Sequence, residues 1–125
     1  DVTGDGKLDI VVKGVIHASA PSAAGGGTVD REVVMIYQVA GEGLKRVFAA
    51  ELARSIGKKR VQGAIGFAGK GDEIELAAGK ATDWTEKTYP FNQDPSAVGG
   101  IEPLILPWSS ARAVRYRWTG SGFSH

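Results

Sequence analysis

The chain has 125 residues, enough for one domain that buries roughly two-thirds of the surface of its unfolded chain. Fifteen basic and fourteen acidic residues give a net charge of +1, which excludes a nucleic-acid binder that relies on overall charge. Cysteine is absent, so disulfides and thiolate metal sites are excluded. No apolar run approaches the roughly 20 residues of a membrane span.

The first nine residues alternate oxygen donors with other residues. Acidic or hydroxyl side chains occupy four odd positions, and the remaining odd position supplies a backbone carbonyl. A hard cation such as calcium takes six to eight oxygens at about 2.3–2.6 Å, and alternating positions on a tight loop can converge on it. Gly6 allows the sharp reversal that such a loop needs. The spacing predicts a Ca²⁺ site formed by Asp1, Thr3, Asp5, Lys7 and Asp9. The alternative is a plain Asp-Gly turn before a strand.

An apolar run follows this loop, whereas an EF-hand would place a bidentate glutamate at Val12 and continue into a helix. The pattern Asp-x-Thr-Gly-Asp-Gly-x-x-Asp-Ile-Val-Val resembles the calcium loops of FG-GAP and VCBS-type repeats, found in integrin-like β-propellers and secreted bacterial proteins. It departs from them at Thr3, where Asp or Asn is usual, which predicts weaker binding. The resemblance implies an extracellular, cell-surface or periplasmic protein. We expect more protein upstream of Asp1, whose α-ammonium group would otherwise lie beside the cation.

Hydrophobic alternation predicts strands along the first half of the chain. Residues 8–17 are apolar on both faces, which predicts an interior strand covered on both sides. Residues 18–30 contain a proline and three consecutive glycines and predict a surface loop. Residues 31–39 and 44–48 alternate around a glycine-rich turn, so we expect a β-hairpin.

Residues 48–57 allow two interpretations. Phe48, Leu52 and Ile56 recur at helical spacing, and Gly57 would end a helix there. The alternative is one long strand continuing from Leu44. We favour the strand because the rest of the chain has strand-like patterns.

The second half predicts another hairpin, an irregular segment and a last strand. Residues 60–68 and 73–76 alternate around a glycine-containing turn. Four prolines fall among large apolar residues between 82 and 110, which predicts an ordered excursion packed over the sheet, with a short strand at 104–106. Residues 112–118 show the clearest alternation in the chain.

Two turns share a pattern. The stretch that begins Tyr37-Gln-Val-Ala-Gly41 matches the stretch that begins Tyr116-Arg-Trp-Thr-Gly120, with a second glycine and an apolar residue closing each. Repeated blade hairpins or two unrelated hairpins would both produce it. We therefore predict an all-β fold of antiparallel sheets, either propeller-blade-like repeats or a compact sandwich. The domain would span 1–125, as the C-terminal part of a longer protein.

Catalytic and nucleotide-binding motifs are weak. The two histidines are isolated, no Gly-x-Ser-x-Gly sequence occurs, and Gly69-Lys70 lacks the residues of a phosphate loop. Carboxylate pairs could support glycoside hydrolysis, but we expect Glu73 and Glu75 to form a solvated strand edge. We therefore predict a protein that is not an enzyme. The other carboxylates considered are Glu51 and Glu102.

Aromatic and basic residues offer two further binding surfaces. Trp84, Trp108 and Trp118 could stack on sugars if they were exposed and coplanar, but core packing is the favoured interpretation. A solvated strand face is likewise favoured over an anion-binding stripe for the basic residues. These basic residues are Lys58, Lys59, Arg60, Arg112, Arg115 and Arg117.

The sequence thus predicts a non-enzymatic, calcium-stabilised structural or adhesive module of a secreted or cell-surface protein. We expect calcium as its cofactor and a protein or glycan as its surface partner, with no nucleic acid and no membrane span. The alternatives are a carbohydrate-binding module that uses the tryptophans and an accessory domain of a larger enzyme.

Overall fold

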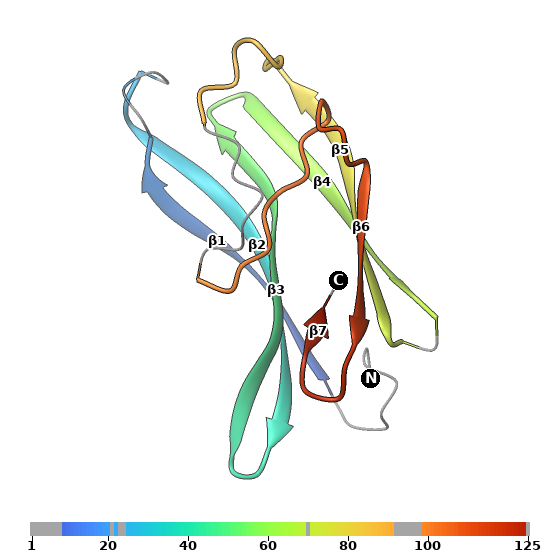
Figure 1. Ribbon diagram of the computed structural model, residues 1–125. Helices are drawn as coiled ribbons and strands as arrows, with labels where there is room; N and C mark the ends of the chain where they lie inside the picture. The colour runs from blue at the N-terminus through green and yellow to red at the C-terminus, as the bar shows by residue number, and fades with distance from the viewer. Residues whose placement is uncertain (1–8, 21, 23–24, 70, 92–98, 125) are drawn as a thin grey trace.

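The computed structural model describes residues 9–20, 22, 25–69, 71–91 and 99–124. Its seven strands form one antiparallel sheet in which each strand pairs with the next one along the chain (Figure 1). The predicted all-β class is confirmed, and the strands make one continuous sheet that does not close into a barrel. None of the described residues forms a helix that could cross a membrane. The strands are β1 (Asp9–Ser19), β2 (Thr28–Ala40), β3 (Gly43–Ile56), β4 (Lys59–Ala68), β5 (Glu73–Thr82), β6 (Ala113–Trp118) and β7 (Phe123–Ser124).

The two predicted hairpins join β2 to β3 and β4 to β5, and β3 and β4 form a further hairpin that was not predicted. Two residues connect β3 to β4, and the first of them, Gly57, has a φ of 58°, a conformation that glycine adopts without strain. The two echoed turns connect β2 to β3 and β6 to β7, so both are hairpin turns. The strand interpretation of residues 48–57 is confirmed, because β3 continues through Ile56.

The prediction that residues 8–17 form an interior strand is wrong. Among the strands that the structure describes, β1 lies at the edge of the sheet and pairs with β2 alone. Apolar side chains on both of its faces remain accessible, and Val15 is 52% exposed. Side-chain polarity could not predict this exposure, because the burial of a strand depends on which other elements pack over it. The exposed apolar residues of β1 are Ile10, Val11, Val12, Val15 and Ile16.

The sheet has two arms, one formed by β1, β2 and β3 and the other by β4, β5, β6 and β7, which are joined at one end. β3 and β4 pair over only four residue pairs next to their turn and then diverge (Figure 1). The main core lies between the arms, where the Phe48 ring of β3 meets Tyr116 of β6 at 5.1 Å and Phe123 of β7 at 5.8 Å between ring centroids. Burial between the arms therefore holds together strands that share no hydrogen bonds. The buried core residues are Val34, Ile36, Val47, Phe48, Ala50, Ile74, Leu76 and Tyr116.

The segment between β5 and β6 runs along the free side of β3. Glu102 donates its backbone N–H to the carbonyl of Ala49 at 2.8 Å and accepts from the N–H of Glu51 at 3.0 Å. The hydroxyl of Tyr116 donates to Glu102 Oε2 at 3.2 Å. The predicted ordered excursion is confirmed in the described part of this segment. Its predicted strand at 104–106 is wrong, because the strand-like contact to β3 forms at Glu102 instead.

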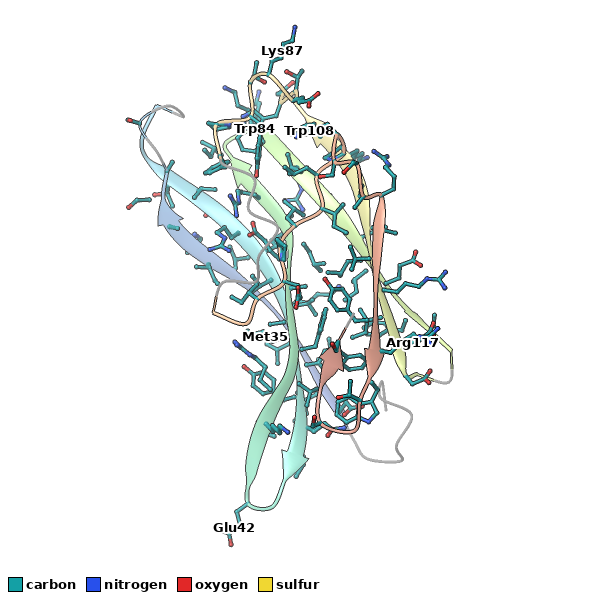
Figure 2. The ribbon with its side chains drawn as sticks, in the orientation of Figure 1. Met35, Glu42, Trp84, Lys87, Trp108 and Arg117 are labelled. Carbon is teal, nitrogen blue, oxygen red and sulfur yellow. The ribbon has the colours of Figure 1, made fainter. Side chains whose placement is uncertain are left out.

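A second core cluster lies at the end of the sheet where β3 turns into β4. Trp84 and Trp108 gather there, opposite the hairpin tip marked by Glu42 (Figure 2). They pack around Val61, which is fully buried, and Leu106. The prolines of the excursion thus bend a chain whose apolar side chains still reach the sheet.

Candidate functional site

Of the predicted calcium ligands, the structure describes only Asp9. Asp1, Thr3, Asp5 and Lys7 lie outside the described residues. Asp9 is the first residue of β1, opposite Gln38 of β2, and its Oδ1 atom is shielded from water. Among the residues that the structure describes, no group of three or more His, Asp or Glu side chains is placed to hold a metal ion.

The exposed charges on β5 and β6 form cross-strand pairs. Arg115 Nε lies 2.9 Å from Glu75 Oε2, and Arg117 Nε lies 3.1 Å from Glu73 Oε1. The guanidinium groups remain mostly exposed, in line with a solvated strand face. His17, the histidine within the described residues, pairs with Asp30 across β1 and β2 at an exposed position.

Trp84 and Trp108 pack edge-on against Tyr89, and Trp118 packs at a tilted angle against Phe123. Trp84 and Trp108 each lie 5.4 Å from Tyr89 between ring centroids, at steep interplanar angles. Trp118 packs against Phe123 at 5.3 Å. Trp84 is buried and the other two are half-buried. The rings pack into the core, as favoured from the sequence. They do not form a coplanar surface on which a sugar could stack.

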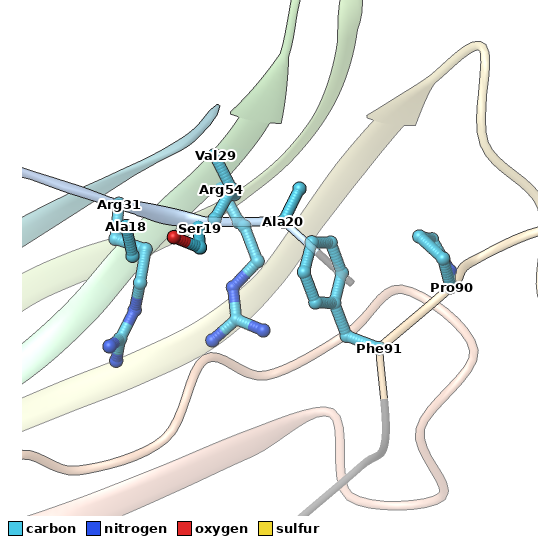
Figure 3. Close-up of a pocket in the computed structure, with 8 residues that line it drawn as sticks. All are labelled: Ala18, Ser19, Ala20, Val29, Arg31, Arg54, Pro90 and Phe91. Atoms are coloured by element: carbon cyan, nitrogen blue, oxygen red, sulfur yellow. The ribbon is translucent and has the colours of Figure 1, made fainter. Parts of the chain in front are cut away.

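A surface groove lies where β1, β2 and β3 meet the chain that follows β5. It encloses about 400 Å³ (Figure 3). Two arginines, one from β2 and one from β3, extend side by side into it, while the other lining residues are small or apolar. The groove is open to solvent, and its volume lies within the range of small-molecule pockets. The lining residues are Ala18, Ser19, Ala20, Val29, Arg31, Arg54, Pro90 and Phe91.

Both arginines bind one buried carboxylate, that of Glu51. Arg31 donates to Glu51 Oε1 through Nε at 3.1 Å and Nη2 at 2.9 Å. Arg54 donates through Nε to Oε2 at 2.8 Å and through Nη2 to Oε1 at 2.7 Å. The Glu51 side chain is only 3% exposed, whereas those of Arg54 and Arg31 are 19% and 31% exposed. A carboxylate this deeply buried requires such partners.

A β-bulge brings Glu51 and Arg54 to the same face of β3. Residues three apart on a regular strand point to opposite faces. Here Val33 pairs with Glu51 but the preceding residue of β2 pairs with Ala53, so Leu52 is an extra residue. The bulge thereby places Glu51 and Arg54 beside Arg31, which pairs directly with Arg54 across the sheet.

Aromatic residues from the excursion cover Arg54. The centroid of the Phe91 ring lies 4.6 Å from the guanidinium carbon, at cation–π distance. Burial lowers the pKa of Arg54, but the bonds and charge of Glu51 outweigh this effect and raise it overall. Burial also raises the pKa of Tyr89, which interacts with the same guanidinium. The phenol of Tyr89 is therefore neutral beside a permanently charged arginine.

Sequence reasoning named Glu51 only as one of several carboxylates and did not connect it to either arginine. A Glu-x-x-Arg spacing has no structural meaning on a regular strand. The bulge that gives it meaning arises from pairing with β2 and leaves no plain signal in β3 itself.

No protein-family model, curated protein or solved structure matches the chain. The likeness of its first dozen residues to FG-GAP and VCBS calcium loops therefore stays a prediction from the sequence.

Proposed function

We propose that the chain is a non-enzymatic structural or adhesive module of a secreted or cell-surface protein, and that a calcium ion fastens its first strand. The ion would be held by the loop that supplies Asp1, Thr3, Asp5, Lys7 and Asp9. Its role is to neutralise carboxylates that would otherwise repel one another at the entrance to the sheet.

The position of Asp9 carries this proposal. Asp9 lies in β1, so the last donor of the alternating series is held by pairing with Gln38 while one of its oxygens is shielded from water. A ligand anchored by a sheet loses little freedom on binding, which favours a site formed by the preceding loop. An ion that holds the start of a strand requires a ligand loop directly before that strand, and the sequence predicts this order.

Calcium should raise the melting temperature. If the dissociation constant lies near 10⁻⁴–10⁻³ M, as in extracellular calcium modules, calcium at about 10 mM stabilises the fold by about 1.4–2.7 kcal/mol. For a domain of this size that corresponds to a rise of several degrees. Circular dichroism melts in calcium and in chelator measure it.

Asp5→Asn should abolish the increase, because it removes one of the charged ligands. Glu42→Gln is the matched control: it removes one charge at the exposed tip of the β2–β3 hairpin and should keep the full increase (Figure 2). Identical wild-type melts with calcium and with chelator would refute the proposal.

A further inference from the structure

We propose that the groove bounded by Arg31 and Arg54 is a binding site for an organic carboxylate with an apolar body. This site is separate from the proposed calcium loop, and the inference does not depend on that proposal. Its elements are a charge excess, unused hydrogen-bond donors and apolar walls, all among residues that the structure describes.

The groove carries an excess of positive charge. Among the residues that the structure describes, its lining contains two guanidinium groups and no acidic residue, and Glu51 beneath them supplies one negative charge. The described residues therefore present one net positive charge to the groove. The nearby carboxylates Asp30 and Glu32 are engaged elsewhere, with His17 and Arg60 respectively. A ligand with one negative charge would neutralise this positive charge.

Arg31 also has N–H donors that Glu51 does not use, whereas Arg54 makes a further bond to Tyr89. A guanidinium has five N–H donors, and the bonds to Glu51 use Nε and Nη2 of each arginine. The Nη1 atoms take no part in those bonds. The shared carboxylate holds both planar groups side by side, as Figure 3 shows, so their orientation is set before a ligand arrives. Arginines preorganised in this way suit a carboxylate, whose two oxygens accept parallel N–H bonds.

The walls indicate what adjoins the carboxylate. Apolar surface comes from two alanines, one in β1 and one directly after it, from Val29 of β2 and from the pair Pro90 and Phe91. Ser19 is the polar residue among them. A sugar would leave most of its hydroxyl groups without partners here, which disfavours it. A short hydrocarbon chain fits the lining, whether it belongs to a free acid or to the C-terminal residue of a peptide.

Titration followed by NMR tests the site. Hexanoate represents the free acid, and N-acetylleucine represents a peptide C-terminus. Each should give saturable shifts at residues 18–20 and at the Nε–H groups of both arginines, with a dissociation constant on the order of 10⁻³ M. Tighter binding of one probe identifies the source of the carboxylate. The neutral analogue 1-hexanol should bind at least about tenfold more weakly, because it lacks the charge-assisted bonds.

Matched variants separate recognition from general charge. Arg31→Gln should weaken hexanoate at least about tenfold, and Arg31→Lys less, because lysine keeps the charge but loses the planar fork. Arg115→Gln removes the same charge from the exposed face of β6 and should leave the affinity unchanged. Ala18→Leu, which fills the groove without touching its charges, should also abolish binding.

The proposal is overturned if neither acid gives saturable shifts, if hexanol binds as tightly as hexanoate, or if Arg31→Gln and Arg115→Gln weaken binding equally. Arg54 keeps its two bonds to Glu51 in the Arg31 variants, so these are expected to fold. Ala18→Leu tests the same groove without altering the ion pairs, and unchanged hexanoate binding to this variant would likewise overturn the proposal.

Discussion

At the scale of single residues, the protein depends on close contacts that few side chains allow. Gly79 in β5 is the extra residue of a bulge opposite β4, between the partners of Gln62 and Gly63. A Cβ atom at this position would overlap the backbone carbonyl of Gln62. Because backbone cannot move aside as a flexible side chain does, glycine is required there for steric reasons rather than for a turn.

Gly79→Ala should lower the free energy of unfolding by about 1–3 kcal/mol, the usual cost of an overpacked contact. Gly66→Ala is the matched control in β4, where a Cβ would meet nothing within 4 Å, and it should leave stability unchanged or slightly raised. Urea denaturation of both variants measures the difference. Equal stabilities would show that the β4–β5 pair shifts to accept the methyl group.

The contribution of an ion pair to stability likewise depends on where it lies in the fold, as the pairs around Glu51 show. Arg115 and Glu75 form a pair of similar length on the surface, where such contacts contribute little to stability. Glu51 is withdrawn from water and bound by two guanidinium groups, so loss of both partners would leave a buried charge uncompensated.

At the scale of the elements, β1 is the strand whose environment differs most from its composition. An exposed, apolar edge strand can pair with another chain, and such edges favour aggregation unless charged residues interrupt them. Lys13 is the one basic residue within the first eight residues of β1. The remaining apolar side chains make this strand the element most open to self-association among those described.

Val15→Lys should suppress aggregation at high concentration and change the free energy of unfolding by less than about 0.5 kcal/mol. Val15 is largely exposed and faces Glu32 across β1 and β2, so a lysine there gains an opposite charge. Light scattering and urea denaturation measure the two effects. Val34→Lys makes the same change at a buried position of β2 and should prevent folding. Unchanged scattering of Val15→Lys would exclude β1 as the contact.

At the scale of the whole molecule, the excursion after β5 joins the two arms. Glu102 bonds to β3 through its backbone and to Tyr116 of β6 through its side chain. β3 and β6 share no strand pairing, so this residue links the arms directly across the main core. Ionisation of the Tyr116 phenol should therefore affect the stability of the entire fold.

Alkaline pH should destabilise the protein through Tyr116. Burial, followed by the charge of Glu102 and the bond to it, raises the pKa of this phenol. In the unfolded chain a tyrosine ionises near about pH 10, so above that pH the unfolded state binds fewer protons than the folded state. The stabilising contribution is complete below about pH 10 and is lost as the pH rises further.

Urea denaturation at about pH 8 and about pH 10.5 measures this loss. Tyr116→Phe cannot ionise, so its stability should decline less steeply between the two values, although the variant loses the bond to Glu102. Tyr89 keeps a smaller decline in the variant, because burial raises its pKa as well. Parallel declines of wild type and variant would contradict the assignment to Tyr116.

Local patterns in the sequence anticipated much of the fold. The alternation in β2, β4, β5 and β6 predicted strands, and glycines at short turns predicted the β2–β3 and β4–β5 hairpins. These features depend on neighbours along the chain, which a sequence displays directly. The continuation of β3 through Ile56 was the harder choice, since Phe48 and Leu52 also fit a helix, and pairing with β2 decides it.

Long-range pairing decided the rest. The sequence by itself determined an all-β chain, the β2–β3 and β4–β5 hairpins and the series of oxygen donors at its start, because strand period, turn chemistry and donor spacing are local properties. Only the tertiary structure placed β1 at an edge, joined the arms through Glu102 and brought Arg31, Glu51 and Arg54 together. The physical reason is that a bulge, a sheet order and a buried ion pair are set by which strands meet, and residues far apart in the chain determine that jointly.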